Sequence, residues 1–439
     1  MHGGTKIVRY WYNHSKFNSR AIDHAFNYIS AVTGIGFIRD QSAAQVWRSD
    51  DETAPETARI DLGQSDEIRA FNESYSKMGN VTDGTMLSGD PVEEIIRKLS
   101  LKARLGPLSG DSSSERTSEG PRLSRLITLL IGRLSDLGVI DRKSPGIDLW
   151  PGESRFAIAI THDVDIARRS VLGSVRLLWH KDPPGHLRGL LDSITSALGG
   201  RNPYDRISEW LRLEDDHGLK STFFFFAGDR TDNRDPKYRI SELSKSIDQI
   251  RNRGFELAVH SGIAGHSGES LSGTRSMMWD YAEGKIAGLR PHYLSAHLPE
   301  YWKAAASAGF AYTSCLGFDD DIGFFDGIDL PFVPFDIEND STIDIVEIPI
   351  GIMDCGLIRN DSADSDEVFE RGRRLIDDGE KAGGLIVLDW HQRTLYDPDY
   401  PGWGRLFWKL VEYARDKGAY FAKMHEISSL LKSGMGDMS

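Results

Sequence analysis

The sequence predicts an α/β protein in which a small N-terminal α/β domain precedes a distorted barrel of about seven strand–helix units. The chain has 439 residues, which is more than one ordinary core and enough for two domains. From residue 156 onward, short apolar segments alternate with helix-like segments, and this predicts a parallel sheet close to a closed barrel. We place the small domain at residues 1–120, a connecting helix and lead-in at 121–150, and the barrel at 151–432.

The N-terminal part contains strand-like and helix-like stretches joined by loops rich in Asp, Ser and Thr. Asp90 and Pro91 favour a helix start, because Asp caps free N–H groups and Pro is tolerated in the first turn. Residues 105–121 have the Gly, Ser and Pro content of a linker, so we predict a mobile connection there. The predicted strands cover residues 6–11 and 58–62, and the predicted helices cover residues 19–32, 91–102 and 122–137.

The barrel part contains seven apolar segments of strand length separated by helix-like stretches. One helix is predicted to end near residue 217, and another to cover residues 242–252. The amphipathic stretch 171–179 is predicted to be a helix packed on the barrel, with a peripheral membrane contact or a lid over the site as alternatives. The predicted strands cover residues 156–161, 221–227, 255–260, 311–315, 345–350, 385–389 and 419–424.

Composition limits the classes of partner and the compartment. The net charge of −14 argues against nucleic acid as the main partner, since phosphate binding needs a basic face. The two cysteines, Cys315 and Cys355, show neither a disulfide framework nor the spacing of a cysteine–zinc site, which favours a reducing compartment. The N-terminus lacks a leader pattern and no run of about eighteen apolar residues occurs, so we expect no transmembrane segment and a cytoplasmic location.

Polar residues follow the predicted strands at four separate ends, where chemistry sits in such barrels. Asp163 and Asp165 come at the end of the apolar run 156–160, and side chains two positions apart in a strand project to the same side. Asp354 and His391 follow other apolar runs in the same way. Paired carboxylates at a strand end indicate a catalytic or metal-binding site.

Two histidines, His260 and His266, follow the strand predicted at 255–260. Gly262 and Gly265 permit the loop between them to turn back on itself. Two imidazoles and one carboxylate form a three-ligand site for zinc or a similar divalent ion, with a position left open for water. The alternative for each histidine is a structural side chain satisfied by hydrogen bonds.

A third group lies around Asp389, His391 and Arg290. Asp389 and His391 are two positions apart and should face the same way, and a carboxylate that orients a histidine makes it a good general acid near neutral pH. Arg290 can pair with the base carboxylate or bind a substrate oxygen. The alternatives are an Asp–His pair that only packs a strand end and an ordinary surface arginine.

With these residues in view, residues 156–426 resemble the polysaccharide deacetylases, the NodB-homology family of metal-dependent carbohydrate esterases. The family motif Thr-Phe-Asp-Asp-Gly corresponds to Thr-His-Asp-Val-Asp at 161–165, with Val164 inserted between the two acids. The resemblance implies that Asp163 is the catalytic base and Asp165 a metal ligand. The two metal histidines of the family are four residues apart, whereas His260 and His266 are six apart.

The resemblance extends to the other strand ends. An Arg-x-Pro motif resembles Arg290 followed by Pro291, and a Leu-x-His motif resembles residues 388–391. The implied mechanism uses a divalent metal, with Zn²⁺ expected, and His391 as the acid that protonates the departing amine. Trp390 and Tyr293 are predicted to stack on a sugar ring.

Three functions remain open. The first is a hydrolase that removes an N-acetyl or related acyl group from a carbohydrate, such as a nucleotide- or lipid-linked precursor of a surface glycan. The second is hydrolysis of another carbon–nitrogen bond, because the fold alone does not choose the substrate. The third is a glycan-binding or scaffolding protein without turnover, which the inserted Val164 and the spacing of His260 and His266 favour.

Overall fold

The computed structural model describes residues 7–10, 19–39, 91–101, 106–107, 118–136, 146–171, 183–359 and 361–436. The strand predicted at 58–62, the helix predicted at 171–179 beyond its first residue, and residues 108–117 of the predicted linker lie outside this part. None of the helices in the described ranges is long and apolar enough to cross a membrane.

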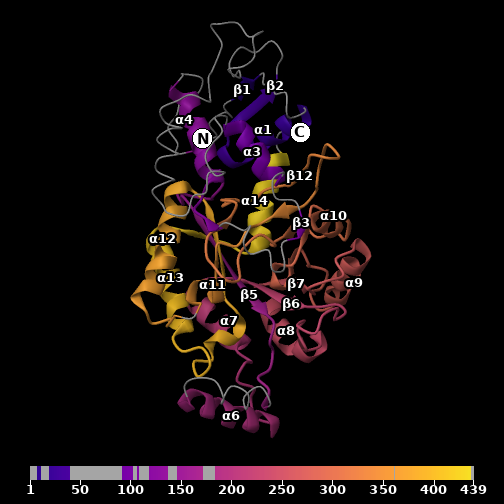
Figure 1. The fold of residues 1–439 in the computed structure, drawn as a ribbon, viewed down its shortest axis with the longest axis vertical. Coiled ribbons are helices and arrows are strands. Elements are labelled where there is room, and N and C mark those ends of the chain that lie inside the picture. The colour runs from indigo at the N-terminus through magenta and orange to yellow at the C-terminus, as the bar shows by residue number, and fades with distance from the viewer. Residues whose placement is uncertain are drawn as a thin grey trace.

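A parallel sheet of nine strands forms the centre of the molecule (Figure 1). The strands at its two ends, β14 and β15, are not paired with each other, so the described sheet is an incomplete barrel. The predicted fold class, a distorted parallel α/β barrel, is therefore confirmed. The hydrogen-bonded order is β14 (Val346–Glu347), β10 (Tyr312–Thr313), β8 (Gly288–Pro291), β7 (Glu256–Ser261), β6 (Thr222–Phe226), β5 (Ala157–Val164), β16 (Leu385–Asp389) and β15 (Ile352–Met353), and β17 (Tyr420–Phe421) also pairs with β5.

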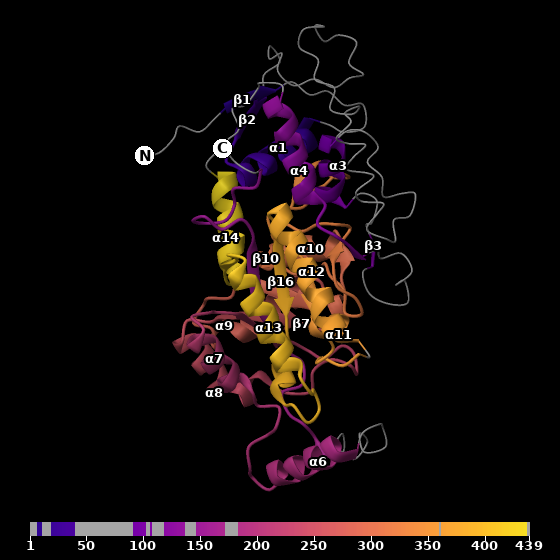
Figure 2. The same ribbon diagram turned by 90° about the vertical axis from the view of Figure 1, so that its left-hand side faces the viewer.

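Helices cover the outside of the sheet (Figures 1 and 2). All residues of β5, β6 and β7 are buried, which explains the apolar runs at residues 157–160, 223–226 and 257–259 within them. The outer elements are α7 (Ile207–Asp216), η3 (Ile240–Leu243), α8 (Ser244–Asn252), α9 (Gly268–Trp279), α10 (Glu300–Ser307), α11 (Asp354–Ile358), α12 (Asp366–Ala382), α13 (Trp403–Asp416) and α14 (Met424–Gly436), and two short 3-10 turns, η4 (His292–Leu294) and η5 (Gln392–Leu395), follow β8 and β16.

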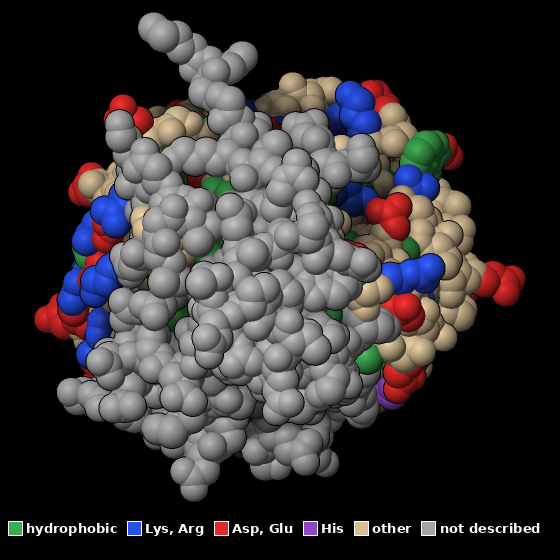
Figure 3. Space-filling model, turned by 90° about the horizontal axis from the view of Figure 1, so that it is seen from above, with side chains coloured by type: hydrophobic (Ala, Val, Ile, Leu, Met, Phe, Trp, Pro, Cys, Tyr) green, Lys and Arg blue, Asp and Glu red, His purple; other side chains and the backbone are tan. Residues whose placement is uncertain are grey.

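The N-terminal elements lie at one end of the barrel, beside the last turns of α14 (Figure 1). Helix α1 packs against α14, and the Tyr28 hydroxyl donates to the Pro331 carbonyl at 3.0 Å. The buried apolar residues of both parts form one continuous core. Figure 3 views this end, where basic and acidic side chains are interspersed along the visible rim. The elements are β1 (Ile7–Tyr10), α1 (Ser19–Thr33), β2 (Gly36–Arg39), α3 (Pro91–Ser100) and α4 (Leu123–Asp136).

Both described ends of the segment predicted as a linker are paired with the barrel part. Strand β3 (Gly106–Pro107) pairs with β9 (His297–Leu298), and β4 (Ser118–Glu119) pairs with β11 (Phe324–Phe325). Backbone hydrogen bonds hold these end residues, and the mobile connection predicted for residues 105–121 stays a prediction. The last two-stranded pair joins β12 (Phe335–Asp336) to β13 (Ser341–Thr342).

The strands differ from their predicted lengths in two ways. Strand β5 extends three residues beyond its predicted end, so Asp163 lies inside the strand. Strand β10 has two residues instead of the predicted five. Beyond β10, the Glu347 carboxylate accepts the backbone N–H groups of Cys315 and Leu316 at 2.8 and 3.0 Å, so a side chain replaces the neighbouring strand as acceptor.

Candidate active site

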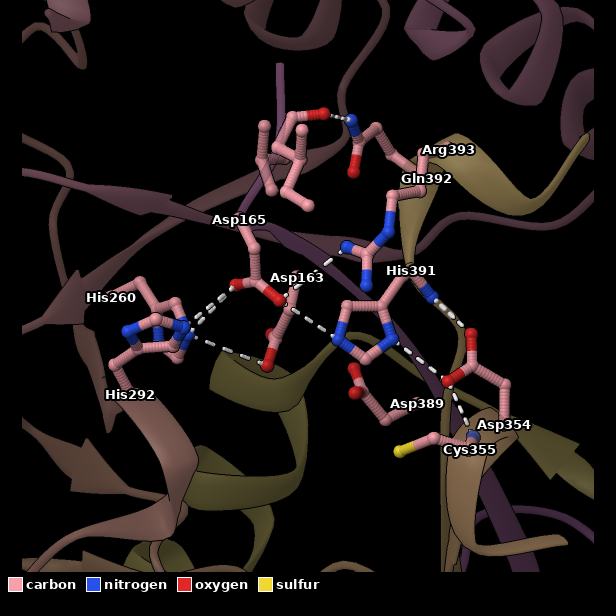
Figure 4. Close-up of polar contacts among 12 residues, drawn as sticks. Asp163, Asp165, His260, His292, Asp354, Cys355, Asp389, His391, Gln392 and Arg393 are labelled. Atoms are coloured by element: carbon pink, nitrogen blue, oxygen red, sulfur yellow. Dashed lines mark hydrogen bonds and ion pairs between the residues drawn. The ribbon is translucent and has the colours of Figure 1, made fainter. Parts of the chain in front are cut away.

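Strand β5 directs alternate side chains to opposite sides of the sheet. Thr161, Asp163 and Asp165 contribute to one cluster of polar side chains (Figure 4). His162 points the other way, where its Nε2 lies 2.8 Å from the Glu214 carboxylate in the packed interior. The period of two predicted from the sequence therefore separates the candidate site from a buried hydrogen-bonded pair.

Asp165, His260 and His292 form the first group that can hold a metal. One donor atom from each residue lies within 4.8 Å of the others. The Asp165 Oδ1 atom lies 3.3 Å from His260 Nε2 and 3.7 Å from His292 Nε2 (Figure 4). His260, at the end of β7, is oriented by a 3.0 Å contact between its Nδ1 and the Arg290 carbonyl.

The donor set fits a divalent metal. Asp165 Oδ1 is buried and has no hydrogen-bond partner, although a buried carboxylate oxygen normally has one. Two imidazole nitrogens and one carboxylate oxygen suit Zn²⁺ and leave a fourth position for water. A backbone carbonyl on the remote nitrogen of His260 is the kind of outer contact that fixes a ligating imidazole.

The structure does not bring His266 into this group. Its Nε2 lies 2.6 Å from the Gly262 carbonyl, and its ring packs edge-on against Tyr301. The chain turns away after Gly265, which has a φ of +79°, and Ser267 then caps α9. Sequence reasoning missed His292, although it lies two positions after Arg290 at the end of β8, the spacing that identified the two acids of β5.

Arg290 holds Asp163 beside the metal group. Its guanidinium is fully buried, and Nη1 lies 2.8 Å from Asp163 Oδ1 and 2.7 Å from Asp389 Oδ1. The second oxygen of Asp163 lies 3.7 Å from His260 Nε2. Arg290 was predicted either to pair with the base carboxylate or to bind a substrate oxygen. In the structure it pairs with Asp163, the candidate base.

Asp389 does not orient His391 as predicted. Its Oδ1 accepts hydrogen bonds from Thr161 at 2.6 Å and from Arg290. Burial, with the neighbouring Asp163 carboxylate, raises the pKa of Asp389 to about 6. Asp163, Asp389 and His391 form a second group of donor atoms within 4.8 Å, but the guanidinium of Arg290 contacts both carboxylates of this group.

Asp354 takes the place predicted for Asp389. Its Oδ1 lies 2.8 Å from His391 Nδ1, and its Oδ2 accepts the backbone N–H of His391 at 2.8 Å. Strands β15 and β16 pair in parallel, so the first residue of α11 meets the residues that follow β16. The sequence indicated that Asp354 follows a strand, but it did not indicate that His391 is its hydrogen-bond partner.

His391 also contacts the metal group. Its Nε2 lies 3.0 Å from Asp165 Oδ2. Burial alone would lower the pKa of His391, but Asp354 and Asp165 outweigh it and raise that pKa well above the ordinary value. Burial alone would raise the pKa of Asp165, but His391 and His260 hold it well below its usual range. The Asp165 carboxylate therefore lies between the imidazoles of His260 and His391.

A cavity of about 290 Å³ is lined by the whole first group and by Asp163 and His391 of the second, and its wall also includes Asp319, Met353 and Cys355. A second cavity of about 450 Å³ shares Asp165, His292, Tyr293 and Arg393 with it. Arg393, missed by sequence reasoning, lies with its Nη1 3.4 Å from Asp165 Oδ2 and its Nε 2.9 Å from the Tyr400 hydroxyl.

The two aromatic residues predicted to stack on a sugar have different surroundings. Tyr293 is 48% exposed and lines both cavities, so its ring is available to a ligand. Trp390 is fully buried, and its ring packs against Phe407 in the core. The prediction for Trp390 is therefore wrong. Trp390 directly precedes His391, which faces the cavity, and side chains one position apart in an extended chain point to opposite sides.

Comparison with known proteins gives matches at the level of structure. No protein-family model and no curated protein sequence matches the chain. The structure of a candidate polysaccharide deacetylase from Mycobacterium smegmatis matches at 19% identity and a TM-score of 0.44, covering 65% of this chain and 92% of that one. The PuuE allantoinase matches at 15% identity and a TM-score of 0.43, covering 67% and 98%.

A mutant of a CE4-family pseudoenzyme also matches, at 11% identity and a TM-score of 0.31, covering 76% of this chain and 96% of that one. All of these likenesses are below 25% identity and below a TM-score of 0.5.

Proposed function

We propose that the protein is a metal-dependent hydrolase that removes an N-acetyl or related acyl group from a carbohydrate. The observation that carries this proposal is the convergence of three kinds of group on one cavity. These are a candidate metal site at Asp165, His260 and His292, a carboxylate at Asp163 and an oriented imidazole at His391. Their residues come from the ends of four separate strands, β5, β7, β8 and β16.

Zn²⁺ is the metal we propose for the first group, with Asp165, His260 and His292 as its ligands. When bound, such an ion lowers the pKa of its water towards neutrality and polarises the acyl oxygen. Asp165 and His260 both lie at ends of buried strands, so their positions need little adjustment on binding.

Asp163 acts as the general base in this proposal. Arg290 holds one of its oxygens, and the other lies on the side of the metal ligands, where it can take a proton from the attacking water. His391 acts as the general acid. Asp354 orients its ring and favours its protonated form, and its Nε2 faces the cavity where a leaving nitrogen would sit.

The substrate we propose is an acetylated sugar in a nucleotide- or lipid-linked precursor of a surface glycan. The second cavity extends the site beyond the reacting group and supports a substrate larger than one acyl group. Tyr293 is the aromatic residue available to stack on a sugar ring. Cys315 and Cys355 are both free thiols, which supports the cytoplasmic location included in this proposal.

The alternative is a catalytically inactive barrel that binds a glycan or acts as a scaffold. The contact between His391 Nε2 and Asp165 Oδ2 at 3.0 Å favours it, because the candidate acid is ion-paired with a candidate metal ligand. An enzyme that acts on another carbon–nitrogen bond is the third possibility, since the same residues would serve an amide in another substrate.

Elemental analysis of the purified protein distinguishes these functions. The enzyme proposal expects one zinc ion per chain, lost in Asp165→Ala and His292→Ala and retained in His266→Ala as the matched control. Acetate release from acetylated sugars is then measured, with allantoin as a substrate of the third possibility. A wild-type protein that holds no metal after reconstitution, yet binds glycans, would support the non-catalytic barrel.

A further inference from the structure

We propose that helix α6 (Pro183–Ala197) and the residues beside it form a docking surface for an anionic membrane. In Figures 1 and 2, α6 lies at the end of the molecule opposite the N-terminal helices and apart from the helices that cover the sheet. This surface is separate from the candidate catalytic residues, and its membrane contact does not depend on the proposed function.

The outer face of α6 is apolar. Leu191, Ile194 and Leu198 are 57%, 40% and 84% exposed, and their spacing of three and four residues places them on one side of the helix. Seven large apolar side chains in the described ranges are exposed, and three of them are in this row. A row of exposed aliphatic side chains is costly in water and marks an interaction surface.

The opposite face of α6 is anchored to the barrel, which keeps the apolar row outward. The buried Arg169 donates through Nη1 to the Gly189 carbonyl and to Ser193 Oγ, at 2.5 and 2.8 Å. The same guanidinium binds Asp399 through Nε at 2.5 Å. Tyr396 donates to the Asp192 carboxylate at 2.5 Å. These polar contacts orient the helix without covering its leucines.

Exposed arginines flank α6 in a chain whose net charge is −14. The described residues of the stretch 166–206 include five arginines, of which Arg169 and Arg206 pair with Asp399 and Glu209, whereas Arg168, Arg188 and Arg201 are exposed. Arg168 and Arg188 are mostly exposed, and their ion pairs with Glu242 and Asp192, at 3.9 and 4.0 Å, are longer than hydrogen bonds. These two arginines therefore remain available to anionic headgroups.

The apolar row and the arginines together indicate what kind of partner binds this surface. An amphipathic helix with aliphatic residues on one side and basic residues at its flanks binds at the boundary between anionic headgroups and acyl chains. A protein partner would satisfy the apolar row, but the exposed arginines at its flanks are what an anionic leaflet complements.

The docking surface adjoins the second cavity. Ile166 and Arg168 line that cavity, and Ile166 is itself 45% exposed. Arg169, the next residue, is the anchor of α6. A chain docked through α6 would therefore hold the cavity mouth near the leaflet, where a substrate carried on a lipid is presented.

Co-sedimentation with vesicles tests the proposal on the full chain. One set of vesicles contains phosphatidylcholine alone, and the other also contains phosphatidylglycerol. We expect binding to the second set, weakened by added salt, and a fall of about tenfold or more in Leu191→Glu/Leu198→Glu, because each buried leucine contributes to insertion. The matched control, Ser272→Glu/Met277→Glu, adds the same charges at exposed positions of α9 and should bind as the wild type does.

Two results would overturn the membrane assignment. One is a wild-type protein that stays in the supernatant with both sets of vesicles while size-exclusion chromatography shows a dimer that Leu191→Glu/Leu198→Glu dissociates. The other is equal sedimentation of the α6 variant and the α9 control. Circular dichroism of both variants checks that they are folded. Arg168→Gln/Arg188→Gln should reduce binding only to the anionic vesicles. A variant that loses vesicle binding but keeps the metal content of the wild type shows a defect in docking alone. Failure of docking can therefore be told apart from failure of the proposed enzyme.

Discussion

Asp354 and His391 are joined by two hydrogen bonds, each of 2.8 Å, one to the imidazole Nδ1 and one to the backbone N–H. The carboxylate therefore fixes the ring and the main chain of His391 together. Because Asp354 is fully buried, its negative charge acts on the imidazole with little screening by water.

Replacement of Asp354 by Asn should lower activity and change its pH dependence. Asp354 raises the pKa of His391, so its removal lowers that pKa. A general acid must be protonated, and the alkaline limb of the kcat/KM profile should therefore move to lower pH, with a loss of about 10² to 10⁴ in kcat. Asp364→Asn, at an exposed position, is the control. An unchanged alkaline limb in Asp354→Asn would show that His391 is not the acid.

His292→Ala should abolish stoichiometric zinc binding, whereas His266→Ala should not. His292 Nε2 lies 3.7 Å from Asp165 Oδ1, and His266 is hydrogen-bonded to the Gly262 carbonyl. Isothermal titration of the metal-free proteins with Zn²⁺ measures the difference. Loss of binding in His266→Ala with retention in His292→Ala would reverse the ligand assignment.

Asp235 should position His292 for metal binding. Its Oδ1 lies 3.6 Å from His292 Nδ1, and its two oxygens accept backbone N–H groups from Thr231, Asp232 and Ile263. Loss of an outer carboxylate of this kind costs about 10- to 100-fold in metal affinity, and we expect that loss in Asp235→Asn. Asp232→Asn, whose carboxylate pairs with Arg234, is the neighbouring control. Equal zinc affinities in the two variants would remove this role from Asp235.

Asp329 should make folding stability depend on pH. It is buried and accepts from the backbone N–H and hydroxyl of Ser124, and burial raises its pKa from 3.8 to about 6. A raised pKa in the folded state contributes stability that is present below the unfolded pKa and lost as the pH rises through about 6. The wild type should therefore gain about 2 kcal/mol relative to Asp329→Asn between about pH 7 and about pH 4.

Urea unfolding of both proteins at several pH values measures this difference. Comparison with Asp329→Asn cancels the titration of the other carboxylates, because the amide keeps the geometry and does not ionise. A stability difference that stays constant across this pH range would show that Asp329 has an ordinary pKa.

Much of the barrel was predictable because its strands are buried on both faces. Such strands are apolar runs of four to eight residues, and β5, β6, β7 and β16 were predicted within three residues of their observed ends. The shorter strands β10, β14 and β17 have two residues each, because their neighbours are loops and side chains as well as strands. The local sequence does not identify those neighbours, so it does not predict the lengths of these strands.

The sequence by itself determined which polar side chains share a face. Asp163 and Asp165 both face the cavity because side chains alternate along a strand, and this depends on local geometry alone. Only the tertiary structure decided that His292 and Asp354 take the positions predicted for His266 and Asp389. Those choices depend on how loops turn and on which strands pair, and both are set by contacts between residues far apart in the chain.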